Sequence, residues 1–373
     1  MTEIVELEPV EPMQPGVALS SLTTLGVGGE CAAFAEPMND DEVAETILAA
    51  RERNLPLFIV GGGSNTLAAD HDKHGVVLRS ADYTMQVEPV EDDGVLVRAG
   101  AGVEWDELVA FTVNEGWAGL ECLSGIPGRV GAAPIQNIGA YGQEVSETIL
   151  GVEAMDRRNQ QLVALSAEEL KFAYRHSRLK GEWRDRYVVL RVMFRLRADG
   201  VPTLKYEELK REANARAGGK PPTLLQVRET VLRVRKRKSM VWSEKDPNRR
   251  SAGSFFMNPV VDVATADAVS AAAEAAGHDV SRMPRHAAGE GTEKLSAAWL
   301  IERAGFARGF AFGRAGLSTK HCLAVVNRGG ASARDLVALA SIVRRAVREQ
   351  FGVTLVPEPV FVGFDDTVDN LLR

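Results

Sequence analysis

Residues 124–142 have the sequence SGIPGRVGAAPIQNIGAYG, and this stretch decides how the rest of the chain is interpreted. It contains five glycines, two prolines and almost no charge, yet it includes Gln136 and Asn137. A helix or a strand would not tolerate that density of glycine, and a surface loop would be more polar. We interpret the stretch as a buried, irregular backbone that wraps a flat ligand and offers it amide and carbonyl groups. A purely structural loop is the alternative.

Upstream, a second glycine-rich segment at 61–66 (GGGSNT) follows LFIV at 57–60, a short apolar run that is typical of a buried strand. Glycines in this position expose backbone N–H groups to an anion such as a phosphate. The segment is not a Walker loop, because no Gly-Lys-Ser/Thr follows, and Thr66 stands where the Rossmann fingerprint needs its third glycine. A simple turn after a strand is the alternative.

Around these two segments, hydrophobic periodicity predicts a mixture of helices and strands. Residues 1–18 are expected as a loose tail and residues 213–222 as a flexible connection. Asn39 or Asp40 can cap the first helix, and Gly116 ends the second. Helices are predicted at 39–53, 104–116 and 228–238. Strands are predicted at 57–60, 76–80, 85–90 and 95–100, and within a strand-rich stretch from about 150 to 197.

The composition and hydrophobic pattern of the sequence change from about residue 254 onward. Ala-rich segments typical of helices alternate with short strands such as CLAVVN at 322–327. The helical segments are predicted at 262–277, 292–304 and 332–351. This shift, which follows a polar loop with the sequence SEKDPNRRSAG, predicts a domain boundary near 240–255.

The chain has 373 residues, with 44 Lys+Arg against 51 Asp+Glu and a formal net charge of −7. This length predicts two or three domains, and the acidic balance gives no general attraction to nucleic acid or to an anionic membrane. The cysteines are odd in number and far apart, which predicts neither a disulfide framework nor a zinc knuckle. The acidic N-terminus lacks the pattern of a signal peptide, and no run approaches the ~20 apolar residues of a spanning helix. A soluble, cytoplasmic protein is the expectation.

Together, GGGSN after a strand and the Ser124–Gly142 stretch downstream of it resemble the UDP-N-acetylenolpyruvoylglucosamine reductases. The resemblance covers roughly residues 20–363 and keeps the order of the family's motifs. It continues through FAYRHS (172–177), LKYEEL (204–209), GSFFMNP (253–259), KLSAAWLI (294–301) and LVPEP (355–359).

The resemblance implies an α+β fold. The FAD-binding part would have the vanillyl-alcohol-oxidase (PCMH) type of fold in two subdomains, followed by a C-terminal α+β substrate-binding domain. In this chain an N-terminal tail is expected at 1–18, the FAD-binding region at 19–240 and the substrate-binding domain at 241–373. The two subdomains of the FAD-binding region are expected at about 19–80 and 81–240.

The resemblance also implies a reaction, the NADPH-dependent reduction of UDP-N-acetylglucosamine enolpyruvate to UDP-N-acetylmuramate in peptidoglycan synthesis. Non-covalently bound FAD would take a hydride from NADPH and pass it to the methylene carbon of the enolpyruvyl ether. Hydride attack beside a carboxylate builds an enolate, so fixed positive charge or hydrogen-bond donors must meet it and an acid must protonate the adjacent carbon. A monomer that binds neither nucleic acid nor membrane is expected.

Three residues match catalytic residues of the family. Arg175, in YRHS, would hold the enolate, because a guanidinium is permanently charged and forks onto a carboxylate. Ser254, in GSFF, would donate the proton; without the resemblance, a helix N-cap is the alternative for this serine. Glu358, between Pro357 and Pro359, would hydrogen-bond the enolic intermediate or orient the acid.

Further contacts that the resemblance implies fall into those to FAD and those to the substrate. Contacts to FAD are expected at Gly61, Gly62, Gly63, Ser64, Asn65, Thr66, Pro127, Gly128, Gly131, Ala132, Ala133, Gln136, Asn137, Gly139 and Arg235. Contacts to the substrate are expected at Tyr206, Lys238, Asn258 and Lys294. Six basic residues in 228–238 concentrate positive charge, which suits two diphosphates better than a solvated helix face.

The sequence departs from the family pattern at three places. Val360 and Met257 replace residues that are often basic in relatives, which puts substrate contacts there in doubt. Ala132 and Ala133 stand where some relatives have serines, so flavin contacts from this turn would come from backbone amides alone.

Two other functions are weighed against this one. An oxidase or dehydrogenase of the same flavin fold would act on a hydroxy acid or a sugar, but neither glycine-rich loop contains the His that often tethers flavin. A non-catalytic nucleotide-sugar binding protein would not need Arg175, Ser254 and Glu358 together.

No metal site is expected. His71 and His74 sit three residues apart, but Asp72 and Lys73 between them suggest an exposed turn, and no third ligand is apparent. Cys122 and Cys322 lie in apolar settings and are interpreted as packing residues.

Overall fold

The computed structural model describes residues 13–72, 75–92 and 94–373, so most of the expected tail and His74 lie outside the described residues. By compactness the chain divides into two units, each assembled from separate segments of sequence. Unit 1 comprises residues 1–18, 30–63 and 72–236, and unit 2 comprises 19–29, 64–71 and 237–373. Compact units are not the same as independently folding domains, so the domain boundaries stated above stay predictions.

Unit 1 begins with a small sheet covered by one helix. In sheet order its strands are β1 (Met13–Gln14), β2 (Ala33–Ala35), β5 (Val76–Leu78) and β3 (Leu57–Ile59). Helix α2 (Asp40–Glu52) begins as predicted at Asn39, whose side chain accepts from the Glu42 amide at 3.0 Å. Val43 and Ile47 of α2 pack against the strands in one buried cluster. The prediction of a loose tail was wrong for residues 13–14, because they pair antiparallel with β2 and bury Met13.

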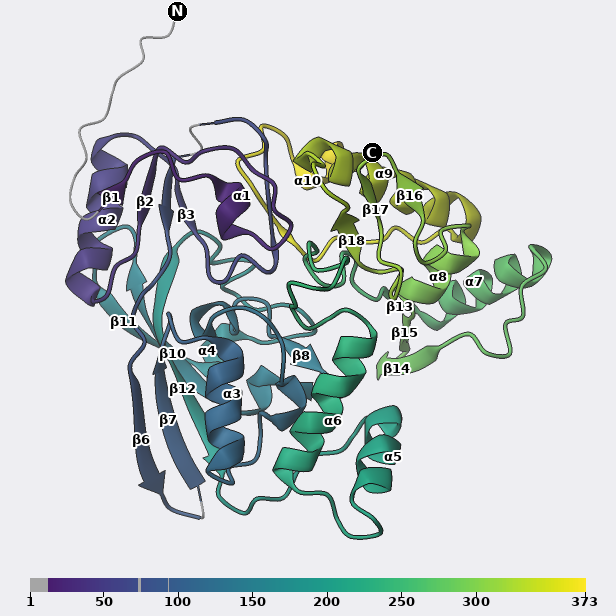
Figure 1. The fold of residues 1–373 in the computed structure, drawn as a ribbon, viewed down its shortest axis with the longest axis horizontal. Coiled ribbons are helices and arrows are strands. Elements are labelled where there is room, and N and C mark those ends of the chain that lie inside the picture. Colours follow the sequence, from purple (N-terminus) through teal and green to yellow (C-terminus); the bar gives the residue numbers. More distant parts are fainter. Residues whose placement is uncertain (1–12, 73–74, 93) are drawn as a thin grey trace, which may run out of the picture. The chain divides into compact units, whose positions relative to one another are not determined.

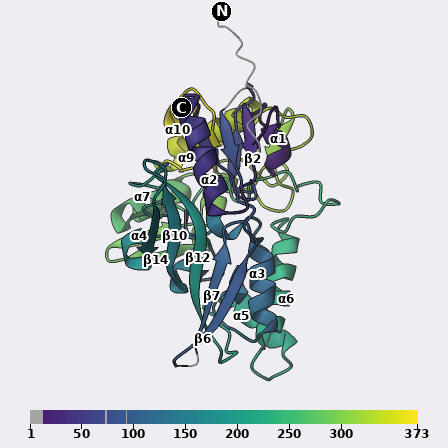
Figure 2. The same ribbon diagram turned by 90° about the vertical axis from the view of Figure 1, so that its left-hand side faces the viewer.

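A five-stranded antiparallel sheet forms the rest of the unit 1 framework, and Figure 2 shows strands of this sheet beside one another. In sheet order the strands are β11 (Leu162–Ser166), β10 (Ile149–Asp156), β12 (Tyr187–Arg197), β7 (Gly94–Gly100) and β6 (Met85–Val90). The predictions of strands in these regions are confirmed. Helix α3 (Trp105–Asn114) packs on this sheet through Trp105, whose ring centroid lies 6.1 Å from that of Phe194 on β12. The short α4 (Ala167–Leu170) follows β11.

Helices α5 (Glu207–Arg216) and α6 (Leu224–Arg237) lie side by side in unit 1 (Figure 1). The basic helix was predicted, but residues 213–216 were wrongly assigned to a flexible connection. The α5 sequence consists mostly of strong helix formers, and only Leu209 and Ala213, one turn apart, are buried. The connection is shorter than predicted and begins where Gly218 and Gly219 adopt positive φ.

Unit 2 contains small sheets and the Ala-rich helices. Its strands are β4 (Thr66–Ala68), β13 (Val260–Asp262), β14 (Arg285–Gly289), β15 (Thr292–Leu295), β16 (Ala311–Phe312), β17 (Ala315–Leu317), β18 (Val325–Asn327) and β19 (Val360–Val362). Its helices are α1 (Leu19–Leu22), α7 (Val263–Ala275), α8 (Ala297–Arg303), α9 (Ala333–Phe351) and α10 (Val368–Leu371). The prediction of a continuous helix at 292–304 was wrong, because 292–295 pairs with strands on both sides. Helix α8 begins only after the Ser296 cap.

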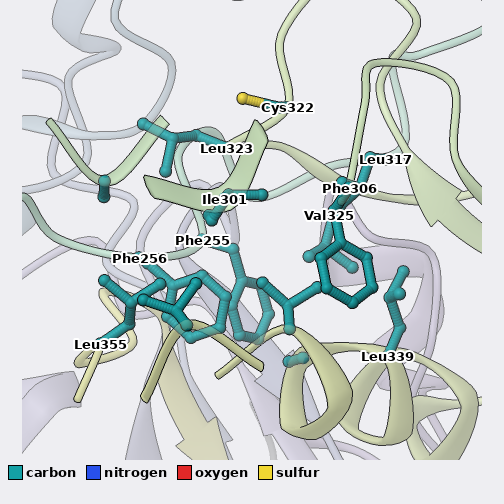
Figure 3. Close-up of a cluster of buried hydrophobic side chains, with 14 of the residues drawn as sticks. Phe255, Phe256, Ile301, Phe306, Leu317, Cys322, Leu323, Val325, Leu339 and Leu355 are labelled. Carbon is teal, nitrogen blue, oxygen red and sulfur yellow. The ribbon is translucent and has the colours of Figure 1, made fainter. Parts of the chain in front are cut away.

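The core of unit 2 is a single large cluster of apolar side chains (Figure 3). Phe255 and Phe256 are fully or almost fully buried in it, together with Ile301 of α8 and Leu339 of α9. This packing fixes the backbone on either side of the two phenylalanines.

Two general properties can be stated for the part of the chain that the structure describes. It contains no helix that is both long and apolar enough to cross a bilayer. Its three cysteines are buried thiols, and burial raises the pKa of Cys322 to about 12, which agrees with the interpretation of Cys122 and Cys322 as packing residues.

Candidate functional site

The predicted site residues are distributed over both units. Unit 1 holds Gly61, Gly62, Gly63, Pro127, Gly128, Gly131, Ala132, Ala133, Gln136, Asn137, Gly139, Arg175, Tyr206 and Arg235. Unit 2 holds Ser64, Asn65, Thr66, Lys238, Ser254, Asn258, Lys294 and Glu358. The first glycine-rich loop therefore passes from one unit into the other between Gly63 and Ser64, and the two groups of residues are described in turn.

In unit 1 the two glycine-rich loops pack backbone against backbone. A Cβ atom on Gly62 would lie 2.7 Å from the Cα of Gly128, and one on Gly61 would lie 3.1 Å from the Cβ of Ala132. Real Cβ atoms do not approach backbone as closely as the first of these distances, so Gly62 must be glycine for the loops to meet here. The structure thus brings together segments that the sequence places more than 60 residues apart.

This contact leaves backbone donors at the loop surface. Within the described residues, the amides of Gly61 and Gly62 donate to no protein acceptor. The next residue, Gly63, has a φ of +63°, and successive amides in such a turn form a concave nest for an anion. The residues present therefore fit a group with phosphates, such as the FAD that the sequence predicts.

The Ser124–Gly142 loop has the irregular backbone that was predicted. Its ordered pieces are short: η2 (Val130–Ala132) and β8 (Gly139–Ala140), with η1 (Glu121–Leu123) before it and β9 (Gln143–Glu144) after it. The amides of Gly131, Ala132 and Ala133 donate to the carbonyls of Ala101, Arg129 and Val130. These amides already have acceptors, and the flavin contacts expected from them stay predictions.

Arg175 lies at the tip of a tight turn between α4 and β12. Ala173 and His176 exchange two backbone hydrogen bonds of 3.0 Å, and Arg175 has a φ of +53°, which is costly for a residue with a Cβ. The guanidinium is half-buried, and its Nη1 and Nη2 donate to the carbonyls of Asn137 and Gly139. It also lies 5.2 Å from the ring centroid of Tyr174, within cation–π range.

Arg235, on α6, adds a second guanidinium to this region of unit 1. Its Nε donates to the carbonyl of Gly125, the second residue of the Ser124–Gly142 loop, at 3.3 Å. Burial is the largest effect and lowers the pKa of Arg235; Tyr141 and Asp106 oppose it, and the positive charge of Arg175 adds a smaller lowering effect. A buried guanidinium beside the glycine-rich loop is a candidate partner for an anionic group.

The other basic residues of α6 differ from Arg235. Arg228 forms a bidentate pair with Asp106, at 2.6 and 2.9 Å, and Arg233 lies 3.4 Å from Glu212. The positive charge of this helix is therefore partly neutralised by neighbouring carboxylates of unit 1.

Tyr206 immediately precedes α5, and its side chain is 42% exposed. Its ring packs edge-on against Tyr141 of the Ser124–Gly142 loop, with centroids 5.6 Å apart. Burial of the remaining surface, and to a smaller degree Glu208, raises the pKa of the Tyr206 hydroxyl. The predicted substrate contact is thus an aromatic side chain that packs against the Ser124–Gly142 loop and is still partly exposed.

In unit 2 the structure brings Ser254 and Glu358 onto adjacent segments. The amide of Glu358 donates to the carbonyl of Phe255 at 2.8 Å, and the amide of Met257 donates to the carbonyl of Val356 at 2.9 Å. These bonds form a short antiparallel ladder, in which Phe256 is bridged to Pro357. Because Phe255 and Phe256 are anchored in the core, the backbone that carries Ser254 is held firmly (Figure 3).

The helix-cap alternative for Ser254 is excluded. The next helix, α7, begins at Val263 and is capped by Asp262, whose side chain accepts from the Thr265 amide. Ser254 follows Gly253, which has a φ of +70°, and its half-buried hydroxyl has no hydrogen-bond partner among the described residues of the protein.

Asn65 joins the first glycine-rich loop to the Glu358 segment. Its Nδ2 donates to the carbonyl of Glu358 at 3.2 Å, and its own carbonyl accepts from the amide of Val360 at 2.8 Å. Beyond it, β4 and β19 pair in parallel, with Thr66 opposite Val360. Nothing in the sequence signals this pairing, since the two strands are only three residues long and lie almost 300 residues apart.

The three other predicted substrate contacts have different surroundings. Asn258 already has a structural bond, because its Oδ1 accepts from the Ala297 amide at the start of α8, at 2.9 Å. Lys294 lies on β15 opposite Val260 and His286. Lys238 follows α6, and its charge adds to burial in lowering the pKa of His321 to about 4.

A polar network next to Lys238 was not predicted from the sequence. Asn248 is 3% exposed, and its side chain forms hydrogen bonds with Ser239, Asp246 and Thr319, which fix the predicted polar loop. The Asp-Pro-Asn sequence at 246–248 is a turn signal that could have located it.

Metal binding finds no support in the described ranges. They contain no group of three or more His, Cys, Asp or Glu side chains that could hold an ion. His71 lies 4.0 Å from Asp365, and His74 is outside the described residues.

Comparison with known proteins identifies two regions of the chain. Residues 246–362 match the family model of the C-terminal domain of UDP-N-acetylenolpyruvoylglucosamine reductase, and residues 31–166 match that of the FAD binding domain. A reductase of this name from Thermobifida fusca is 47% identical over 349 residues, which cover 93% of this chain and 97% of the relative. One from Streptomyces coelicolor is 47% identical over 360 residues, or 96% and 92% of the two chains.

Among solved structures, the UDP-N-acetylenolpyruvylglucosamine reductase from Thermus caldophilus is similar over most of its length. The match has a TM-score of 0.62 at 26% identity and covers 94% of this chain and 99% of that one.

Proposed function

Because the chain belongs to the family of the UDP-N-acetylenolpyruvoylglucosamine reductases, we propose that it converts UDP-N-acetylglucosamine enolpyruvate into UDP-N-acetylmuramate with NADPH as the reductant. The chain has the predicted α+β fold with a vanillyl-alcohol-oxidase (PCMH) type FAD-binding region, and FAD is its cofactor. The single observation that carries the reaction is the position of Arg175, whose guanidinium bonds the carbonyls of the same glycine-rich loop that is predicted to bind FAD.

The cofactor would be held by backbone donors and one arginine. The amides of Gly61 and Gly62 offer hydrogen bonds to its diphosphate, and Arg235 offers charge from the end of α6. No His or Cys belongs to either glycine-rich loop, which supports non-covalent binding. When bound, FAD supplies the hydride chemistry between NADPH and the methylene carbon of the substrate.

Arg175 would stabilise the negative charge that develops on the substrate. Its Nη1 and Nη2 donate to the carbonyls of Asn137 and Gly139, which fixes the orientation of the guanidinium. A permanently charged, planar guanidinium matches the geometry of a carboxylate and would stabilise the enolpyruvyl group as it becomes an enolate. The left-handed backbone at this residue supports a functional role, since strain of this kind is concentrated at working sites.

Ser254 would protonate the enolate carbon, and Glu358 would support it. A serine hydroxyl is a weak acid, so it needs a hydrogen-bonding environment that favours loss of its proton. The ladder between the Ser254 and Glu358 segments keeps the serine and the carboxylate on neighbouring strands. Glu358 is stiffened by the prolines on both sides and would hydrogen-bond the enolic intermediate or orient the acid.

The remaining contacts would hold the nucleotide and the sugar. Lys238 and Lys294 would meet the diphosphate and the polar groups of the substrate, and the partly exposed Tyr206 would cover it. Asn258 would use its amide hydrogens, since its oxygen is bound to the start of α8. A cytoplasmic monomer without nucleic-acid or membrane partners completes the proposal.

Two measurements on the purified protein test the proposal. The protein should be yellow, and acid should release FAD into solution. Under anaerobic conditions, consumption of NADPH beyond one equivalent per flavin should require UDP-N-acetylglucosamine enolpyruvate, and the product should be heavier by two hydrogens. A flavoprotein that instead reduces oxygen while oxidising a hydroxy acid or sugar would replace the proposal with the oxidase alternative.

A further inference from the structure

Asn137 has all of its side-chain hydrogen bonds inside unit 1. It is 1% exposed and has a φ of +47°. Its Nδ2 donates to Oε2 of Glu144 at 2.8 Å and to the carbonyl of Ala173 at 3.0 Å, and its Oδ1 accepts from the amide of Ser146 at 3.1 Å. A primary amide has only two hydrogens to donate, so this side chain has no donor left for a flavin.

One of these bonds reaches the turn that carries Arg175. Ala173 opens that turn, and its carbonyl accepts both from Asn137 and from the amide of His176. Ser177, just after the turn, donates to the carbonyl of Ile135 at 2.7 Å. The turn is therefore attached to the glycine-rich loop on both sides of Arg175.

The guanidinium of Arg175 also contacts the Ser124–Gly142 loop. Its Nη1 donates to the backbone carbonyl of Asn137 at 3.4 Å, and its Nη2 donates to the carbonyl of Gly139. A Cβ on Gly139 would lie 2.9 Å from Nη1, so only glycine leaves room for this approach. Asn137 thus touches the arginine through its backbone and holds the arginine's turn through its side chain.

We propose that Asn137 is the positioning residue for Arg175, and that its side chain sets where the guanidinium meets the substrate carboxylate. This inference rests on the proposed function, because it assigns Arg175 to the reacting group. A small displacement of a charged group at the reacting centre costs about 10²-fold in rate even when the protein remains folded.

The first test is Asn137→Gly. Glycine accepts the left-handed backbone without strain, so the variant removes the side chain and its three hydrogen bonds without straining the backbone. We expect turnover with the enolpyruvyl substrate to fall by roughly 10–10²-fold, with NADPH reduction of the flavin nearly unchanged. Amide hydrogen exchange in peptides covering 172–177 should accelerate, a readout that needs no activity.

The second test separates positioning from stability. In Asn137→Asp/Glu144→Gln the donor and the acceptor of the 137–144 bond are exchanged, so that bond can form again. The carboxylate introduced at position 137 still accepts from the Ser146 amide, but it presents an oxygen to the carbonyl of Ala173 and cannot bond it. We expect flavin content and melting temperature to recover relative to Asn137→Gly while turnover stays low.

Asn54→Gly is the matched control. Asn54 is also an asparagine with a left-handed φ, of +51°, in unit 1, but it is exposed and follows α2. It should leave turnover and exchange at 172–177 unchanged.

The outcomes separate the two proposals. Normal turnover in Asn137→Gly, or recovery of turnover together with stability in the double variant, would overturn the positioning role alone. A wild-type protein that does not reduce the enolpyruvyl substrate would overturn the proposed function instead. If Asn137→Gly does not fold, the double variant still decides the question.

Discussion

The Arg175 turn of unit 1 and the Ser254 segment of unit 2 hold their side chains in opposite ways. The guanidinium of Arg175 donates hydrogen bonds to one glycine-rich loop. Two side-chain hydrogen bonds, from Asn137 and Ser177, also attach its turn to the same loop. Ser254 has a backbone fixed by the core beside it, while its hydroxyl bonds no protein group among the described residues. The cation is fixed at its charged end, and the candidate acid is left able to turn toward what it must protonate. A fixed charge and a rotatable hydroxyl suit charge stabilisation and proton delivery respectively.

The largest expected effect comes from Ser254→Ala. Reduction of the flavin by NADPH needs no proton on the substrate, so its rate should be nearly intact. Reoxidation by the enolpyruvyl substrate should slow by roughly 10²–10⁴-fold, the usual contribution of a positioned general acid. Stopped-flow absorbance of the flavin follows the two steps separately. Equal slowing of both steps would indicate a general defect of the flavin site and remove Ser254 from the role of acid.

Arg175→Lys should have the next largest effect. An ammonium cannot reproduce the two forked contacts to Asn137 and Gly139 or a bidentate grip on a carboxylate. Turnover should fall roughly 10²-fold while KM changes little, because the lost interaction belongs to the transition state. Steady-state kinetics with the enolpyruvyl substrate measure this split. A raised KM at unchanged turnover would make Arg175 a binding residue only.

Gly62→Ala breaks the backbone contact on which the unit 1 loops depend. Its Cβ would lie 2.7 Å from the Cα of Gly128, so the loops must separate, at a cost of about 1–3 kcal/mol in unfolding free energy. Flavin content per protein should fall as well, which absorbance of the purified variant measures. In Gly61→Ala the new Cβ would lie 3.1 Å from the Cβ of Ala132, so the loss of stability and of flavin should be smaller. In Gly116→Ala the new Cβ would have no atom within 4 Å, so this variant measures backbone strain alone.

The smallest effect is expected from Asp106→Asn. Asp106 accepts hydrogen bonds from Arg228 and from the amide of Gly125. Burial raises the pKa of Asp106, but these hydrogen bonds and the nearby positive charges together lower it by more, so the folded pKa lies below the ordinary value. The pair therefore stabilises the folded state above pH ~4 and loses this contribution as pH falls through the lower folded value. The pair is partly exposed, so Asp106→Asn should cost about 1 kcal/mol at pH 7.

Urea unfolding at a series of pH values checks the sign of this effect. Wild type and Asp106→Asn should converge as pH falls from ~4 through the lower pKa of Asp106 in the folded state, where its carboxylate becomes protonated. A difference in stability that grows toward acid pH would contradict the lowered pKa of Asp106.

Sequence patterns predicted the elements that carry their own local signals. Helix α2 was located because Asn39 is a standard cap and Val43 and Ile47 share one face. Helix α5 was missed because only Leu209 and Ala213 are buried and the remaining surface is polar. β15 was taken for helix because it runs directly into Ala-rich α8, and its pairing with β13 and β14 is not visible in the local sequence.

The candidate site shows the same division between local and distant information. The glycines of both loops signal a close backbone approach, although not that Gly62 meets Gly128. The protein partners of Asn137 lie 7, 9 and 36 residues away, so its attachment to the Arg175 turn could not be predicted from the loop sequence. The resemblance to a family supplied the roles of Arg175, Ser254 and Glu358, which no spacing rule would have singled out.

The parallel pairing of β4 with β19 has a consequence for how the chain is made. Residues 66–68 are synthesised almost 300 residues before their strand partner, residues 360–362. The β4–β19 pair therefore cannot form until residue 362 has been synthesised, and the edge of β4 lacks this partner until then. Pairings of such high contact order form slowly, which makes this edge the point where a nascent chain is most exposed to aggregation.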